Sequence, residues 1–184
     1  MLRFLPLAFV AASVAYSAPA PKTADPTWLP TKEGDTRVYE VREGDRLLTT
    51  YTDVVTKVEK KDGDLHVTIR RESTSADPFV TTIAVTRGGL LRVAIDDQSL
   101  EKPSVLLKTP PKVGAKWDIG TAHYEVTQEE DLEVPAGKFK AVRVKMTNGR
   151  AETTLWFSPN VGVVKMASTQ GPVVQVLKEF KPGK

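Results

Sequence analysis

The sequence predicts an all-β domain: a single antiparallel, strongly curved sheet of roughly ten strands in largely meander order, closed as a half-barrel or a barrel. Two observations predict this class. Runs rich in Val, Thr, Ile, Tyr and Phe recur along the chain, and such residues favour a pleated surface. Short segments rich in Gly, Pro, Asn and Asp separate them. The runs follow one another too closely for parallel crossovers, so neighbouring strands are expected to be antiparallel.

Each predicted strand is a run of this composition between two turn segments. The expected strands are residues 37–41, 46–60, 65–72, 79–86, 90–96, 122–128, 139–146, 152–157, 163–168 and 173–180. One interval, residues 96–108, has a composition that allows a helical turn, although Pro103 limits its length.

Alternation within these runs separates a buried face from a wet one. Leu65, Val67 and Ile69 share one face of their strand, and His66 and Thr68 share the other. A curved sheet with one apolar face encloses a core, and it can also hold a ligand against its concave side.

The turns have clear sequence signals. Asn148-Gly149 between two strand runs is the strongest hairpin signal in the chain. Residues 135–138, Pro-Ala-Gly-Lys, predict another reversal. In the stretch TLWFSPNVGVVKM, Pro159 suits the first corner of a turn, Asn160 the second, and Gly162 a positive φ. We therefore interpret the serine in this stretch as part of a hairpin, not as a nucleophile.

The N-terminus resembles an export signal. Arg3 precedes an apolar run, and small residues follow it, which predicts a signal peptide over residues 1–17. Residues 18–27 form a Pro/Ala-rich leader, and residues 28–181 form the antiparallel β domain. The apolar run is shorter than a spanning helix needs. We expect no transmembrane segment after signal removal, and a periplasmic or extracellular location.

Charge and cysteine content exclude several classes of function. The formal net charge is only +3, and basic and acidic residues are interspersed, so no nucleic-acid partner is expected. The chain has no cysteine, which excludes disulfides, thiolate metal sites and a cysteine nucleophile. An exported chain of this kind must be stabilised by its core.

Four motifs carry a resemblance to a known family. WLPTKEGDTRVYEV, PPKVGAKWDI, VPAGKFKAVRV and LWFSPNVGVVK occur in this order between residues 28 and 180. In that order they resemble a family of exported bacterial β-sheet proteins of unknown function. A weaker similarity links the chain to curved-sheet carriers of lipoproteins and lipids. The resemblance implies the fold and export, and it implies no catalytic residue.

The residues available for catalysis form no recognisable set. His66 and His123 each lie within a predicted strand, and no His-x-His or His-Glu-x-x-His spacing exists. The acids of residues 129–133 alternate across a strand instead of converging. The sequence therefore predicts no enzyme, no metal site and no cofactor.

The preferred interpretation is an exported, soluble binding protein that holds an apolar ligand, such as a lipid or acyl chain, in its curved sheet. The candidate ligand-binding residues are Tyr51, Phe79, Tyr124, Trp156 and Phe157. Two alternatives remain open. One is a cell-envelope module that binds another protein through a strand edge or surface aromatics. The other is an enzyme that uses the acidic cluster. The oligomeric state is left open.

Overall fold

A computed structural model describes residues 27–183 of the chain. The described part contains twelve strands and no helix, which confirms the all-β class and adds two strands to the roughly ten expected. The strands are β1 (Thr36–Glu43), β2 (Arg46–Lys61), β3 (Asp64–Ser73), β4 (Phe79–Thr86), β5 (Gly89–Ile95), β6 (Gln98–Lys108), β7 (Lys116–Ile119), β8 (Ala122–Val134), β9 (Gly137–Asn148), β10 (Ala151–Ser158), β11 (Gly162–Ser168) and β12 (Val173–Lys181).

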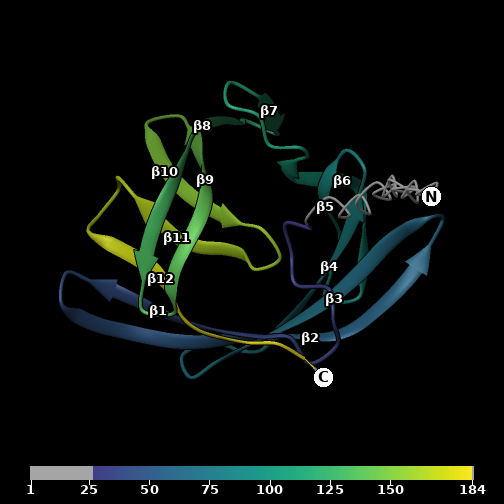
Figure 1. Ribbon diagram of the computed structural model, residues 1–184, viewed down its shortest axis with the longest axis horizontal. Coiled ribbons are helices and arrows are strands. Elements are labelled where there is room, and N and C mark those ends of the chain that lie inside the picture. Colours follow the sequence, from purple (N-terminus) through teal and green to yellow (C-terminus); the bar gives the residue numbers. More distant parts are fainter. Residues whose placement is uncertain (1–26, 184) are drawn as a thin grey trace, which may run out of the picture.

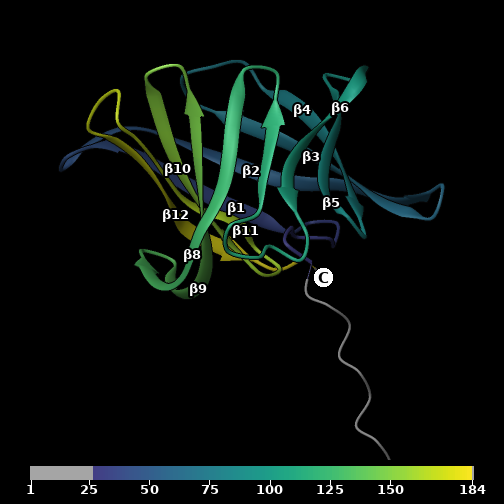
Figure 2. The same cartoon turned by 90° about the horizontal axis from the view of Figure 1, so that it is seen from above.

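All twelve strands belong to one antiparallel sheet that curls round on itself (Figure 1). The order across the sheet is β6-β5-β4-β3-β2-β1-β12-β11-β10-β9-β8-β7. The chain therefore runs as two meanders, and the first and last strands pair in the middle of the sheet. Figure 2, the view from above, shows the long β2–β3 hairpin extending beyond the body of the sheet.

The two edge strands, β6 and β7, nearly close the sheet into a barrel. The indole Nε1–H of Trp117 on β7 donates to the carbonyl of Val105 on β6 at 2.7 Å. The Lys108 ammonium donates to the Lys116 carbonyl at 2.8 Å. These two bonds replace a regular ladder, so side chains and not strand pairing hold this seam together.

The two additional strands are β6 and β7. The helical turn that residues 96–108 could have held does not form, because residues 98–108 of that interval are the edge strand β6. Its pairing with β5 is interrupted between Ser99 and Ser104, and Pro103 lies in this interruption. An edge strand tolerates proline there because no ladder hydrogen bond is needed from its nitrogen.

The predicted turns are present. The reversal at residues 158–162 joins β10 to β11, with Asn160 at φ 61° and Gly162 at φ 86°. The Asn148-Gly149 signal joins β9 to β10. The β8–β9 turn contains Pro135 and Ala136, and the Ala136 amide donates to the Leu177 carbonyl of β12 at 3.1 Å. This hairpin tip thus folds against a strand distant from it in the sheet.

A cluster of apolar side chains fills much of the barrel. Its buried members come from both meanders of the sheet, β2–β6 and β7–β10. Leu29, from the segment before β1, packs among them. Trp28 packs against the same cluster. The segment is anchored by the Thr27 hydroxyl, which lies 3.0 Å from the Asn160 side-chain oxygen at the β10–β11 turn.

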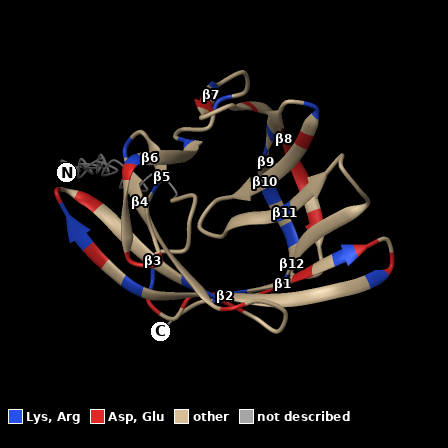
Figure 3. Cartoon of the chain, turned by 180° about the vertical axis from the view of Figure 1, so that it is seen from behind, with Lys and Arg blue, Asp and Glu red and all other residues tan. Residues whose placement is uncertain are grey.

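Basic and acidic residues are interspersed along the strands and hairpins (Figure 3). On β8 and β9, acids face lysines across the ladder, with Glu125 opposite Lys145 and Asp131 opposite Lys140. Such pairs favour this register. The predicted signal peptide and most of the predicted leader lie outside the described residues. Within residues 27–183, no helix is long and apolar enough to cross a membrane.

Candidate functional site

The barrel interior holds a cavity of about 390 Å³. This volume lies in the range of roughly 300–1,000 Å³ that is usual for ligand pockets. The cavity wall is largely apolar and is drawn from nearly every part of the sheet. The apolar lining residues are Leu29, Ile69, Phe79, Ile83, Leu90, Leu106, Ile119, Met146, Leu155, Phe157, Val163 and Met166.

Four charged side chains interrupt this apolar wall. Arg37, Asp53, Arg71 and Arg92 all line the cavity. Arg71 continues the inward alternation of Val67 and Ile69 along β3, so the strand itself directs the guanidinium inward. A charge inside a barrel is costly unless it is paired or hydrogen-bonded.

Asp53 binds two of the three arginines. Arg71 donates Nε to Asp53 Oδ1 at 2.7 Å and Nη2 to Oδ2 at 2.9 Å, which is the bidentate fork of a strong ion pair. Arg37 Nη2 donates to the same Oδ2 at 3.3 Å, and its Nη1 donates to the Val161 carbonyl at 3.2 Å. One carboxylate therefore bridges cations from β1 and β3.

Gly162 makes room for this cluster. A Cβ atom at this position would lie 2.7 Å from Arg37 Nη1. The residue also has a positive φ of 86°, a conformation that side chains disfavour. Both reasons favour glycine at position 162. The residue predicted to form a turn therefore also leaves space for the Arg37 guanidinium.

Two stacked tyrosines adjoin the ion pair. The rings of Tyr39 and Tyr51 have centroids 4.8 Å apart, and the Arg71 guanidinium lies 4.0 Å from the Tyr51 ring centroid. Burial raises the pKa of both hydroxyls above the ordinary value. Tyr39 donates to the Val163 carbonyl at 2.7 Å, whereas the buried Tyr51 hydroxyl has no partner among residues 27–183.

Arg92 has no counter-ion in the part of the chain that the structure describes. Its buried Nε lacks a hydrogen-bond partner there, and it forms no ion pair with any described residue. Burial lowers the pKa of Arg92; Tyr124 opposes that shift and Arg71 adds to it. A guanidinium has five N–H donors and no acceptor, so only an acceptor group can satisfy Arg92 Nε.

The structure brings four of the five candidate residues to this cavity. Tyr51, Phe79, Tyr124 and Phe157 line it. Trp156 does not, because it alternates to the opposite face of β10 from Phe157. Its indole donates to Glu130 Oε1 at 2.8 Å, and the Lys165 ammonium lies 4.9 Å from its ring centroid. A ligand-binding role for any of them stays a prediction.

The sequence analysis missed the arginines. The signal was present, because Arg71 continues the alternating series of Leu65, Val67 and Ile69, and Arg92 stands two residues after Leu90. A charged residue at an inward-facing position of a strand is expensive, so it indicates a polar site within a barrel.

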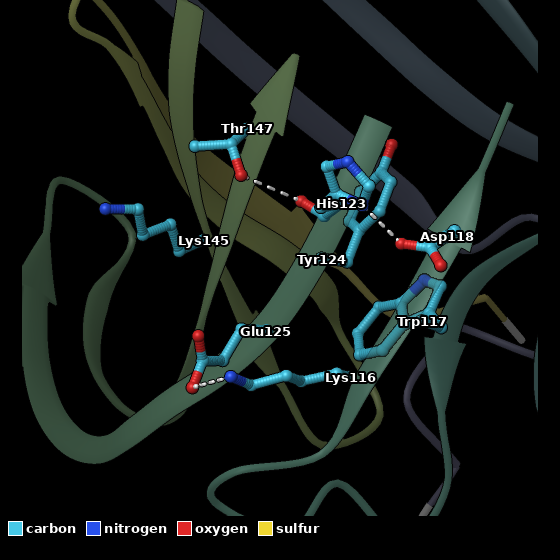
Figure 4. A pocket seen from close by; sticks show the side chains of 8 residues that line it. All are labelled: Lys116, Trp117, Asp118, His123, Tyr124, Glu125, Lys145 and Thr147. Carbon is cyan, nitrogen blue, oxygen red and sulfur yellow. Dashed lines mark hydrogen bonds and ion pairs between the residues drawn. The ribbon is translucent and has the colours of Figure 1, made fainter. Parts of the chain in front are cut away.

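A second hollow lies where β7, β8 and β9 meet (Figure 4). His123 Nδ1 lies 2.6 Å from Asp118 Oδ1. Both side chains are well exposed, His123 at 71% and Asp118 at 67%. Thr147 donates to the backbone carbonyl of His123 at 3.4 Å and not to its imidazole. Asp118, His123 and Thr147 therefore do not form a catalytic triad, because the Thr147 hydroxyl is not hydrogen-bonded to the His123 ring.

The acidic cluster of residues 129–133 is divided among separate partners. Glu130 accepts the Trp156 bond and lies 3.8 Å from Arg143 Nε, whereas Glu133 lies 3.9 Å from Lys138. Among the described residues, no group of three His, Cys, Asp or Glu side chains could hold a metal ion. Glu129, Glu130 and Asp131 line one hollow together with Lys140, and the enzyme alternative stays a prediction.

Comparison with known proteins identifies the fold. No family model and no curated protein matches the chain. Two similar solved structures are a Bacteroides fragilis protein designated as exported, with a YmcC-like fold (12% identity, TM-score 0.62), and a Parabacteroides distasonis protein designated as a lipoprotein (14%, 0.57). The alignments cover 85% and 86% of this chain and the whole of each structure. The likeness shows a shared fold.

Proposed function

We propose that this is an exported, soluble, non-enzymatic binding protein that holds an apolar ligand, such as a lipid or acyl chain, inside its barrel. The observation that carries the proposal is the interior cavity of about 390 Å³ with its largely apolar wall. Such a cavity is the usual form of a small-molecule site. Nearly all of the sheet contributes to the wall, so the whole fold shapes the site.

The driving force would be removal of the ligand from water. Each buried methylene contributes about 0.8 kcal/mol, and interior water next to apolar side chains is released when the chain enters. A well-packed core of this size would have no such space, because protein interiors leave few voids larger than a water molecule. The retained space therefore supports binding over a purely structural role.

Export rests on two supports. The pattern of residues 1–17 is that of a signal peptide, with Arg3 ahead of an apolar run and small residues after it. The two proteins that share the fold are designated as an exported protein and a lipoprotein. A periplasmic or extracellular site would place the protein where lipids move between membranes.

The alternative of an envelope interaction module has less support. Its best surface aromatic, Trp156, is half-buried and engaged with Glu130 and Lys165. The exposed large apolar residues are divided among separate parts of the described chain: Leu47, Leu48 and Val173 lie near the β1–β2 hairpin, and Ile95 and Val113 lie elsewhere. An interaction module also needs no interior cavity, so this alternative does not account for the cavity of the barrel.

Native mass spectrometry tests the proposal on mature protein purified from its own envelope fraction. We expect a stoichiometric, lipid-sized adduct that denaturing mass spectrometry releases and identifies. Thr81→Phe places a larger side chain in the cavity and should reduce the amount of adduct or shift it to a shorter chain. The matched Thr56→Phe on the exposed face of β2 should retain it. A clean apo mass for the wild-type protein would contradict the proposal, and a co-purifying protein would favour the interaction module.

A further inference from the structure

The cavity wall carries two positive charges that no acid on the wall balances. Three arginines and one aspartate line it, and Asp53 is shared by Arg37 and Arg71. Arg92 is the third arginine and has no partner among residues 27–183. A purely apolar ligand would leave both surplus charges uncompensated, which makes the wall a poor match for a neutral hydrocarbon.

The surplus charge lies on one wall of the cavity. Arg71 on β3 and Arg92 on β5 both line it, and their strands flank β4 in the sheet. Arg71 also stacks on Tyr51, whose buried hydroxyl has no partner within the described chain. Three donors, two of them cationic, thus belong to one region, and the only acid in it already accepts three hydrogen bonds.

The apolar wall continues away from this polar region. Arg92 has Ile83 and Ser104 as its cross-strand neighbours on β4 and β6. Met146 and Leu155 line the cavity from strands on the other side of the barrel. An amphipathic molecule matches a wall with one cationic region and an apolar remainder.

We infer that the ligand is an amphipathic anion whose oxyanion head group, a carboxylate or a phosphate, is bound by Arg71 and Arg92 beside the Tyr51 hydroxyl. The inference rests on the proposed function, because it places the apolar chain in the same cavity. Guanidinium groups bind carboxylate and phosphate oxygens in a fork, which gives such head groups both affinity and orientation.

A matched ligand series tests the head group. Calorimetric titration of the mature, delipidated protein uses decanol, decanoate and decyl phosphate, which share one chain length. We expect at least one of the two anions to bind about 10- to 100-fold more tightly than decanol, the range for a hydrogen bond to a charged group. The tighter of the two identifies the head group as carboxylate or phosphate.

Variants assign the effect to the cavity. Arg92→Met should reduce the preference for the anion about tenfold or more and shift decanol affinity little. Arg87→Met, at an exposed arginine of the β4–β5 turn, should leave the preference unchanged. Circular dichroism checks that both variants fold. If Arg92→Met fails to fold, Tyr51→Phe provides the second variant, because it removes only the unpaired hydroxyl; it should weaken anion binding and not decanol binding.

The outcomes separate the inference from the proposed function. Equal affinity of the wild-type protein for decanol and both anions would overturn the inference and leave the proposed function standing, with water as the partner of Arg92. An anion preference that survives in Arg92→Met and Tyr51→Phe would also overturn it. No binding of any of the three ligands would contradict the proposed function itself.

Discussion

Two carboxylate clusters lie on opposite sides of the sheet around β1. Outside the barrel, Glu40 is held by Arg42 at 2.8 Å and by Lys178 at 3.0 Å. Inside, Asp53 is held by two arginines. Both clusters place one nearly buried acid between two cations, because the side chains of Glu40 and Asp53 are 8% and 6% exposed. The clusters differ in their cations: Arg42 and Lys178 are 38% and 51% exposed, whereas Arg37 and Arg71 are 7% and 33% exposed.

The difference teaches what each cluster is for. Water reaches both cations of the outer cluster and screens their attraction to Glu40, so this cluster is expected to contribute little to stability. The inner cluster has lost its hydration, and a buried ion pair is rarely more stable than the apolar residues that could replace it. Keeping three arginines and one acid inside a barrel therefore indicates a role in binding, which is the role we propose.

Asp53→Ala should give the largest effect. It leaves Arg37 and Arg71 buried without their shared acid, and breaking a buried ion pair typically costs about 3–5 kcal/mol. Urea denaturation measures the change in the free energy of unfolding. The control Asp118→Ala, at an exposed ion pair, should change it by less than about 0.5 kcal/mol. Equal effects of the two variants would remove the distinction between inner and outer clusters.

The triple variant Arg37→Met, Asp53→Leu, Arg71→Met sharpens the same comparison. It removes Asp53 together with both of its arginine partners, so neither Arg37 nor Arg71 is left as a buried charge without its acid. We expect stability to return to within about 2 kcal/mol of the wild-type value or to exceed it. Anion binding should be lost. A triple variant as unstable as Asp53→Ala would mean that the cluster stabilises the fold.

Arg92→Met should increase stability. The unpartnered Nε is a buried donor that gains nothing from folding, and removing it should raise the free energy of unfolding by about 1 kcal/mol. Thermal and urea denaturation of the ligand-free protein measure this change. A loss of stability instead would show that Arg92 has a partner in solution and is not held free for a ligand.

Glu40→Gln should give the smallest effect, and the effect should depend on pH. Hydrogen bonds from Lys178 and then Arg42 hold the pKa of Glu40 below the ordinary value of 4.5. A lowered folded-state pKa contributes stability above the unfolded-state pKa, and this is lost as pH falls through the folded-state value. We expect about 0.5 kcal/mol at pH 7 and no difference from wild type in strong acid. Urea denaturation at both pH values checks this.

The fold was largely predictable because its signals are local. Alternation in residues 65–72 and the turn residues Asn160 and Gly162 depend on neighbours in the chain, and the structure agrees with them. The pairing of β1 with β12 was not predictable, because a register between distant segments leaves no local pattern. The short strand β7 was also missed, since Trp117 stabilises it through a contact with β6.

The site was predictable only in part. The aromatic residues Tyr51, Phe79, Tyr124 and Phe157 were named from size and composition, and they line the cavity. Trp156 has the same composition signal, but its strand places it outside, in contact with Glu130. Arg71 and Arg92 could also have been predicted, because each occupies an inward-facing position in the alternation of its strand.

The most direct test of the central claim is a chain-length series. Titration of the delipidated protein with hexanol, octanol and decanol measures the affinity of the interior for an apolar chain. We predict one saturable site, with affinity rising about fourfold per methylene, or about 0.8 kcal/mol, until the cavity is full. Thr81→Phe should shorten the longest chain that fits. Affinity that is weak, non-saturable and independent of chain length would contradict a binding site inside the barrel.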